Sequence, residues 1–222
     1  MTTFLHWMLQ CRLPMALMLS LSVAIGLYAG ASTMAATETP PYAIIQSAPQ
    51  QIEIREYPEL IVAETTTQGD RQQAANQAFR ILADYIFGNN QARKKSDQAS
   101  SEASASEKLA MTAPVIQTSP SNGAGSAQWQ MQFVMPQGAT LASLPLPNHP
   151  AISLKSEPAR RVVVIRFSGT ASEKNLQKHL ALLVDYAAKH RLSTQGEPAY
   201  AFYNPPWTLP FMRRNEIMLR LQ

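Results

Sequence analysis

The sequence predicts an α+β domain made of two similar halves. Two strand-rich passages each contain one long amphipathic helix, and apolar and polar residues alternate along the strand segments. In segment 52–57, Ile52 and Ile54 alternate with Glu53 and Arg55, the pattern of a strand with one buried and one solvated face. The halves share no obvious sequence repeat, so the predicted pseudo-duplication rests on element order alone.

The first half begins with strands and continues into a helix. Asp70 is a typical N-cap residue with Gln73 three positions later, and apolar residues follow at helical spacing until Gly88. These signals predict a helix between Asp70 and Gly88. Strands are expected at residues 42–46, 52–57, 60–67, 109–118 and 129–135.

The second half repeats this order. Thr170 and Glu173 have the spacing of a capping box, which predicts a helix from there to about His190. Strands are expected at residues 152–156, 161–167, 199–203 and 216–221.

Residues 91–107 consist almost entirely of Ala, Ser, Gln, Lys and Glu, with no apolar period. Such a composition cannot bury a core face, so it predicts a flexible surface insertion. We expect no functional residues in it.

The N-terminal residues differ from the rest of the chain. Arg12 precedes an apolar stretch that ends in the small residues Ala29-Gly30-Ala31, which predicts a signal peptide over residues 1–31. The uncharged stretch 13–31 is also long enough to span a bilayer, so an uncleaved inner-membrane anchor is the alternative. We therefore expect an exported domain, in or facing a bacterial periplasm, with a linker at 32–41 and the folded domain at 42–222.

Composition and motifs exclude several classes of function. The 222 residues are 45% apolar and 15% charged with a net charge of +4, which fits one globular domain and gives little support to nucleic-acid binding. Cys11, the only cysteine, lies in the predicted signal, so the domain has neither disulfides nor a reactive thiol. Gly-x-Ser-x-Gly and phosphate-loop motifs are absent. His179 and His190 are roughly 16 Å apart along one predicted helix and cannot share a metal ion.

The most informative segment is the run 203–217, which combines aromatic residues, three prolines and two arginines. Prolines remove backbone donors, so this run cannot be a central strand or a helix interior, yet it is too apolar for a solvated linker. We expect it to form a preformed wall of a ligand site. Its candidate contact residues are Trp207, Leu209, Phe211 and Met212.

The apolar face of the first helix is the second candidate wall. This face consists of Phe79, Leu82, Ala83 and Ile86. An apolar helix stripe is also the ordinary sign of a core-packed helix, so both readings stay open for each residue. Arg213 and Arg214 would pair with carboxylates at the rim, although adjacent arginines are also a common surface feature. Together these residues suit a flat, apolar, acidic molecule.

Four runs in the sequence resemble the SOUL haem-binding proteins. They are IEIREY at 52–57, FRILADYIFG at 79–88, KLAMTAPV at 108–115, and YNPPW through RRNEI at 203–217. The runs occur in family order and span about residues 42–222. This resemblance implies a distorted eight-stranded antiparallel β-barrel flanked by two long helices and built from two similar halves.

The resemblance also implies binding of haem or another tetrapyrrole. The family's pocket is formed by the first helix and the loop before the last strand, which correspond here to the two walls already described. Some members have a histidine in the first motif that is proposed to bind iron, and Glu56 stands at that position. Carboxylates are poor haem ligands, so that bond does not carry over, and the metal ligand is unknown. Met111, Tyr203 and Met212 have side chains that can bind haem iron, but nothing beyond that chemistry assigns them the role.

Two other functions stay open. The same architecture is similar to gyrase-inhibitor-like modules that bind amphipathic effectors, a few of which are hydrolases. In such an enzyme Glu56 and Tyr203 would be the candidate base and acid. Alternatively, the exposed aromatic run of a membrane-tethered protein would dock a partner or the bilayer.

Overall fold

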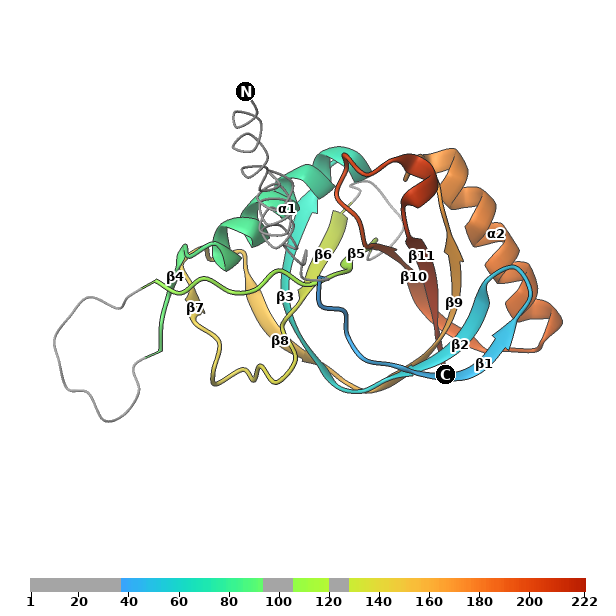
Figure 1. Cartoon of the computed structure of the whole chain (residues 1–222), viewed down its shortest axis with the longest axis horizontal. Coiled ribbons are helices and arrows are strands. Elements are labelled where there is room, and N and C mark those ends of the chain that lie inside the picture. Colours follow the sequence, from blue (N-terminus) through green and yellow to red (C-terminus); the bar gives the residue numbers. More distant parts are fainter. Residues whose placement is uncertain (1–36, 94–105, 120–127) are drawn as a thin grey trace, which may run out of the picture. The chain divides into compact units, whose positions relative to one another are not determined.

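The computed structural model describes residues 37–93, 106–119 and 128–222 (Figure 1). Within these residues two helices accompany a large antiparallel sheet, so the predicted α+β class is confirmed. The elements are β1 (Ala43–Ala48), β2 (Ile52–Tyr57), β3 (Leu60–Gln68), α1 (Arg71–Ile86), β4 (Asn90–Gln91), β5 (Val115–Thr118), β6 (Gln128–Val134), β7 (Leu146–Pro147), β8 (Ser153–Glu157), β9 (Arg160–Phe167), α2 (Glu173–Lys189), β10 (Thr194–Phe202), the 3₁₀ turn η1 (Pro210–Met212) and β11 (Asn215–Leu221).

The main sheet has nine strands in the order β1-β2-β9-β11-β10-β5-β6-β3-β8, and β4 pairs separately with β7. Strands β2 and β3 are far apart in this order, yet only Pro58 and Glu59 connect them. The sheet must therefore curl strongly. Nevertheless, β1 and β8 remain edge strands among the described residues, so the expected closed, eight-stranded barrel is not confirmed.

The two halves have equivalent topologies. In the first half the order is β3, α1, β5 and β6, with only the two-residue β4 between α1 and β5, and in the second half it is β9, α2, β10 and β11. Strand β6 lies between β3 and β5, as β11 lies between β9 and β10. The halves join where β5 pairs with β10, so that Ala201 lies opposite Ile116. This arrangement places the starts of the two helices in corresponding positions.

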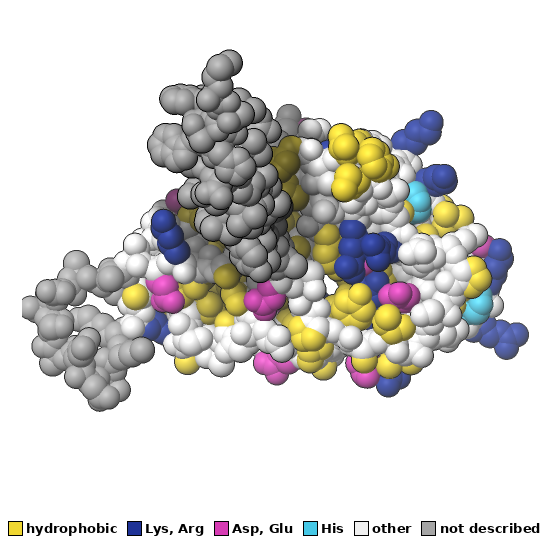
Figure 2. Space-filling view, in the orientation of Figure 1, with side chains coloured by type: hydrophobic (Ala, Val, Ile, Leu, Met, Phe, Trp, Pro, Cys, Tyr) yellow, Lys and Arg dark blue, Asp and Glu magenta, His cyan; other side chains and the backbone are white. Residues whose placement is uncertain are grey.

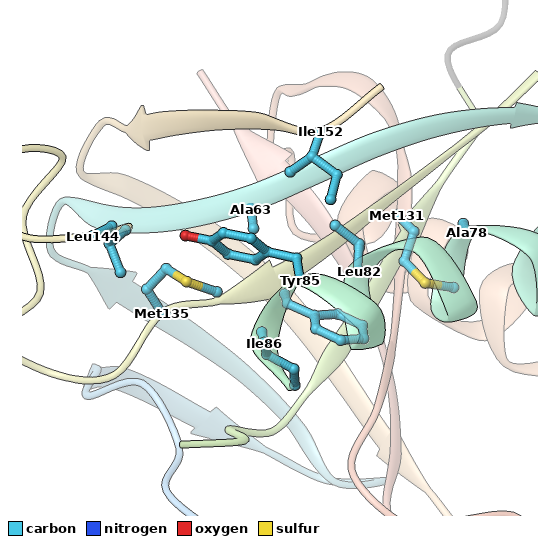
Figure 3. Close-up of a cluster of buried hydrophobic side chains, with 10 residues drawn as sticks. Ala63, Ala78, Leu82, Tyr85, Ile86, Met131, Met135, Leu144 and Ile152 are labelled. Carbon is cyan, nitrogen blue, oxygen red and sulfur yellow. The ribbon is translucent and has the colours of Figure 1, made fainter. Parts of the chain in front are cut away.

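Helix α1 begins as predicted, because the Asp70 carboxylate accepts hydrogen bonds from the backbone N–H groups of Gln72 and Gln73 at 3.0 and 2.9 Å. Its apolar side packs on β3 and β6. Figure 3 shows the resulting cluster, in which Tyr85 lies among side chains from the helix and the sheet. The Tyr85 hydroxyl donates to the carbonyl of Pro145 at 2.9 Å, so this buried polar group is satisfied.

Helix α2 packs on β9 and β11. The predicted capping box at its start is wrong, because the N-cap is Ser172 and its side chain makes no capping hydrogen bond. Thr170 lies two residues before this cap and its hydroxyl donates to that of Ser172. Leu176 and Leu183 bury the inner side of the helix against Ile217 of β11.

We call the sheet face that carries the helices the outer face and the opposite one the inner face. Residues alternate between them along each strand, so Ile217 packs under α2 while its neighbour Met218 belongs to a separate inner cluster. The inner cluster also contains Val162 and Ile116. The curled sheet therefore packs a core on both faces.

Some predictions fall outside the described residues. The signal peptide or anchor (1–31), Cys11 and residues 32–36 of the linker lie there, as does most of the predicted insertion at 91–107. Strand character at 109–118 is narrower than predicted, since β5 covers only Val115–Thr118, whereas β10 begins five residues early at Thr194. Neither helix of the described part combines the length and apolarity that crossing a membrane requires.

Candidate functional site

The segment between β10 and β11, which we call the proline loop (residues 203–214), folds back on itself. Backbone N–H groups of Thr208, Met212 and Arg213 donate to carbonyls three residues earlier. The Asn204 side chain accepts from the backbone N–H of Arg214 at 2.7 Å and closes the loop at its base. Together with its fixed proline φ angles, these bonds define a loop conformation that contains the 3₁₀ turn η1 but no α-helix or strand.

The proline loop exposes its apolar side chains. Trp207 is 82% exposed and Phe211 73% exposed, and Leu209 and Met212 are also more than half exposed. Figure 2 shows a hydrophobic patch where Figure 1 draws this loop, at the top of the described domain. Large apolar side chains clustered on one short surface segment typically mark a binding site. All four side chains are solvent-exposed in this structure.

The predicted residues of α1 divide into two groups. Leu82 and Ile86 are 0% and 1% exposed, and Ala83 is also buried, so these three face the sheet. Phe79 differs, because it is 38% exposed and packs edge-on against Phe133 with 5.4 Å between ring centroids. Of these four predicted contact residues, only Phe79 exposes substantial apolar surface in this structure.

A cleft of about 650 Å³ lies where the two helix starts meet the proline loop. We call it the helix–loop cleft. The hydrogen bond from the Gly169 N–H to the Pro210 carbonyl, at 2.8 Å, attaches the loop to the segment before α2. Phe79 follows Ala75 by one helical turn and extends the same side of α1 beyond the cleft. The cleft is lined by Asp70, Arg71, Gln72, Ala75, Asn76, Thr170, Ala171, Ser172, Glu173 and Arg213.

Two arginines line the helix–loop cleft. Arg213 donates from Nε to the Thr208 carbonyl at 2.7 Å and from Nη2 to the Pro206 carbonyl, which makes it a brace inside the proline loop. These acceptors are neutral, and no carboxylate of the described residues lies within ion-pairing distance of Arg213. Because a guanidinium has five N–H donors, Arg213 retains donors for a ligand carboxylate.

Arg71 is the second arginine, and the sequence reasoning missed it. Its Nη1 donates to the Gln117 side chain at 3.4 Å and its Nη2 to the Ala171 carbonyl at 2.5 Å. Its Nε lies 3.6 Å from the exposed carboxylate of Glu173 and is buried without a hydrogen bond. In the sequence Arg71 is only the residue that follows the N-cap of α1. It becomes a candidate site residue because the duplicated topology places that position beside the start of α2. The two helix starts add partial positive charge to the cleft.

Arg214 has a different role from its neighbour. Its guanidinium bonds one oxygen of the buried Glu216 carboxylate at 2.7 and 2.9 Å, and it stacks 3.9 Å from the Tyr203 ring. Arg55 of β2 bonds both oxygens of Glu216, at 2.8 and 3.1 Å, and the Tyr203 hydroxyl donates to one of them at 2.9 Å. We call these residues the Glu216 network. Arg214 therefore anchors the base of the proline loop.

The Glu216 network keeps its carboxylate ionised. Burial by itself would raise the pKa of Glu216, but hydrogen bonds and charge from Arg55 and then Arg214 outweigh it, so the pKa lies below its ordinary value. Burial and the nearby Glu216 charge raise the pKa of Tyr203 far above its ordinary value. Tyr203 is consequently a neutral hydrogen-bond donor.

The candidate acid–base pair is not assembled. Glu56 lies exposed on the outer face and pairs with Arg161 at 3.3 Å, whereas the Tyr203 hydroxyl bonds Glu216 and the ring packs against the inner cluster. In residues 37–93, 106–119 and 128–222 no three His, Cys, Asp or Glu side chains are grouped to hold a metal ion.

These features define an α+β domain with two equivalent halves, a curled antiparallel sheet, and a cleft beside an exposed apolar loop. The SOUL heme-binding protein family model matches residues 37–220, and the chain belongs to this family. It is a family of binding proteins. A comparison with curated protein sequences finds no significant match.

Solved structures confirm the fold over most of the chain. The C-terminal domain of EcmrR is similar with a TM-score of 0.56 at 13% identity, covering 79% of this chain and 99% of that one. An uncharacterized conserved protein from Listeria innocua gives 0.54 at 13% identity, with 78% and 93% covered. A hydrolase from Listeria innocua gives 0.52 at 13% identity, with 78% and 92% covered. At these identities the likeness concerns the fold.

The described residues fit a flat, carboxylated tetrapyrrole better than they fit a dedicated iron site. The proline loop supplies apolar surface and the helix–loop cleft supplies Arg213 and Arg71. Among the donors considered, Tyr203 is bound to Glu216, and Met111 does not line the cleft. Met212 is an exposed thioether on the proline loop, but it is not among the residues that line the cleft, so it remains a donor by its chemistry alone.

Proposed function

We propose that this chain binds haem or another tetrapyrrole at the helix–loop cleft and acts as a carrier, buffer or sensor. The observation that carries the proposal is the proline loop, which holds four exposed apolar side chains directly before Arg213, a cleft-lining cation. Membership of the SOUL family supports the same ligand class. The separation of Glu56 from Tyr203 supports binding rather than catalysis.

In this proposal the proline loop and α1 contact the ring of the ligand. Trp207 and Phe211 cover one face of the macrocycle with apolar surface, and Phe79 extends that surface along α1. Because the loop is already closed by its own hydrogen bonds, little conformational entropy is lost on binding. The ring then gains affinity chiefly from removal of apolar area from water.

Arg213 and Arg71 orient the ligand through its carboxylates. Arg213 has unused N–H donors, and Arg71 lies across the same cleft with its Nε unbonded. Arg214 contributes indirectly by fixing the base of the loop to Glu216. Bound iron would supply redox and ligand-binding chemistry, whereas holding the ring requires only these protein contacts.

We also propose that the domain works outside the cytoplasm, because residues 1–31 have the pattern of a signal peptide. Mass spectrometry of the protein from fractionated bacterial cells tests this. A soluble periplasmic product beginning near Ser32 is expected. An intact N-terminus in the membrane fraction would instead support the anchor formed by residues 13–31.

Titration of the full chain with haemin, followed by absorbance, tests the ligand. We expect saturable one-to-one binding with a Soret band shifted from that of free haemin. Metal-free protoporphyrin should also bind, because the proposed contacts are to the ring and its carboxylates. A haemin spectrum identical to that of free haemin, without saturation, would refute the proposal.

A further inference from the structure

A second cleft, of about 230 Å³, lies on the inner face of the sheet. We call it the strand cleft. Three residues of the inner apolar cluster, Ile116, Val162 and Met218, belong to its lining. The other lining residues are mainly polar, and none is shared with the helix–loop cleft. Clefts at the mouth of a curled sheet are common ligand sites, and this one has room only for a small molecule.

Arg160, the first residue of β9, supplies an unsatisfied donor to this cleft. Its Nη1 is buried and has no hydrogen-bond partner among the described residues. The guanidinium lies 5.6 Å from the centre of the Tyr57 ring, a distant cation–π contact that offers no acceptor in its place. A buried guanidinium N–H without an acceptor is costly, so the site favours a ligand that brings one.

The charges around Arg160 do not neutralise it. Burial lowers the pKa of Arg160 and the positive charge of Arg220 lowers it further, although Glu157 acts in the opposite direction. Arginine nevertheless stays protonated under ordinary conditions. Arg220 is exposed, lines the same cleft, and has no ion-pair partner among the described residues.

Glu157, an acidic residue of the same lining, bonds a neighbouring amide and not Arg160. Glu157 accepts a hydrogen bond from Gln132 Nε2 at 3.3 Å and forms no ion pair with Arg160. The same Gln132 nitrogen donates to the buried Glu64 at 2.9 Å, and Glu64 in turn pairs with Lys155. Glu157 is thus held within a polar group on β6, β3 and β8, and Glu197 is the other acidic residue of the lining.

We propose that the strand cleft binds a small carboxylate that carries a short apolar chain. The carboxylate accepts from Arg160, with Arg220 at the rim adding a second positive charge. The chain lies on Ile116, Val162 and Met218, where it replaces water on apolar surface. This site is separate from the tetrapyrrole site and does not depend on it.

The test compares three six-carbon probes on the full-length wild-type protein by isothermal titration or ligand-observed NMR. Hexanoate, hexanol and hexylamine have the same number of carbon atoms and differ in the head group, so the comparison needs no mutation. A ligand this small should bind in the millimolar range. We expect hexanoate to bind at least about tenfold more tightly than either other probe, the factor that corresponds to one good charged hydrogen bond.

Arg160→Met tests the assigned donor, and Arg161→Met is its matched control. Arg161 is the next residue of β9 and lies on the outer face, where it pairs with Glu56. Arg160→Met should weaken hexanoate about tenfold or more while leaving hexanol unchanged, and Arg161→Met should leave both unchanged. Prior loading with haemin should not alter hexanoate binding, because the two clefts share no residue.

Three results would overturn the proposal: no saturable hexanoate binding at millimolar concentrations, hexylamine binding as tightly as hexanoate, or equal effects of Arg160→Met and Arg161→Met. If Arg160→Met fails to fold, the head-group comparison on the wild-type protein decides. None of these results depends on whether haemin binds.

Discussion

Helix α1 and the proline loop are both rich in apolar side chains, but the fold uses those side chains differently. Leu82 and Ile86 of α1 are inaccessible and hold the helix on the sheet, whereas Trp207 and Phe211 of the loop project into solvent. The loop keeps its shape through backbone hydrogen bonds, Arg213 and the Glu216 network. Stability and ligand contact therefore reside mainly in different segments, which separate mutations can distinguish.

The largest effect on stability is expected from Glu216→Gln. This change removes the negative charge between Arg55 and Arg214 and leaves two guanidinium groups without their partner. Breaking a buried ion pair in this way costs about 3–5 kcal/mol of unfolding free energy, measurable by urea denaturation. The control Glu56→Gln removes an exposed pair with Arg161 and should cost about 0–1 kcal/mol. Equal effects of the two variants would contradict the assigned role of Glu216.

The lowered pKa of Glu216 also predicts that the unfolding free energy depends on pH. Because its pKa is lower in the folded protein than in the unfolded chain, its contribution is complete above the unfolded value, about 4.3, and is lost as pH falls towards the folded value. Wild-type stability should therefore drop more steeply than that of Glu216→Gln below about pH 4.3. Parallel stability curves for the two proteins would show that Glu216 is not the group responsible.

Leu82→Ala is expected to be the next largest perturbation. Removing a fully buried leucine from the cluster in Figure 3 should lower the unfolding free energy by about 2–5 kcal/mol. The molecules that remain folded should bind haemin with nearly wild-type affinity, because Leu82 has no exposed surface. Val184→Ala, at a half-exposed position of α2, is the control and should change stability by about 0.5 kcal/mol or less.

The double change Trp207→Ala and Phe211→Ala should have the opposite effect to Leu82→Ala: a large loss of haemin affinity with little loss of stability. Both side chains are exposed, so the unfolding free energy should change by only about 0.5 kcal/mol. Haemin affinity should fall about 30-fold or more, because aromatic anchors dominate binding surfaces of this kind. The paired change Ile44→Ala and Ile45→Ala removes exposed apolar residues of β1 and is the control. Loss of stability without loss of haemin affinity would show that the proline loop is not part of the haemin site.

The smallest effect is expected from Arg213→Met. Loss of one carboxylate partner should weaken haemin about tenfold or less, since the ring contacts remain. Haemin dimethyl ester, which lacks free carboxylates, should lose less affinity than haemin, because only the bracing role of Arg213 in the proline loop affects it. An equal loss for haemin and its ester would mean that Arg213 acts only as the internal brace of the proline loop.

Local signals in the sequence predict much of this fold. The Asp70 cap and the alternating segment 52–57 depend on near neighbours, and both are found where expected. The N-cap of α2 is Ser172 and not the predicted Thr170. Serine and threonine are both good N-cap residues, so residue type alone does not distinguish the two positions. Each of the nine strands of the main sheet overlaps a predicted strand segment, but the strand order and the open edges at β1 and β8 depend on long-range pairing, which residue spacing does not encode.

The candidate site could be predicted only in part. The prolines identified the exposed loop, but an apolar stripe on α1 has the same pattern whether it faces a ligand or the core. The adjacent arginines have similar sequence surroundings, yet Arg214 is bound to a buried carboxylate while Arg213 lines the cleft. Arg71 enters the site only because the two helix starts meet in space.

Hydrogen exchange of the full chain with and without haemin tests the central claim, that the ligand lies between the proline loop and the start of α1. The account predicts slower exchange of amides in residues 203–214 and 71–79, with little change in the strands around Arg160. Protection confined to the strand cleft, or no protection at all under saturating haemin, would contradict it.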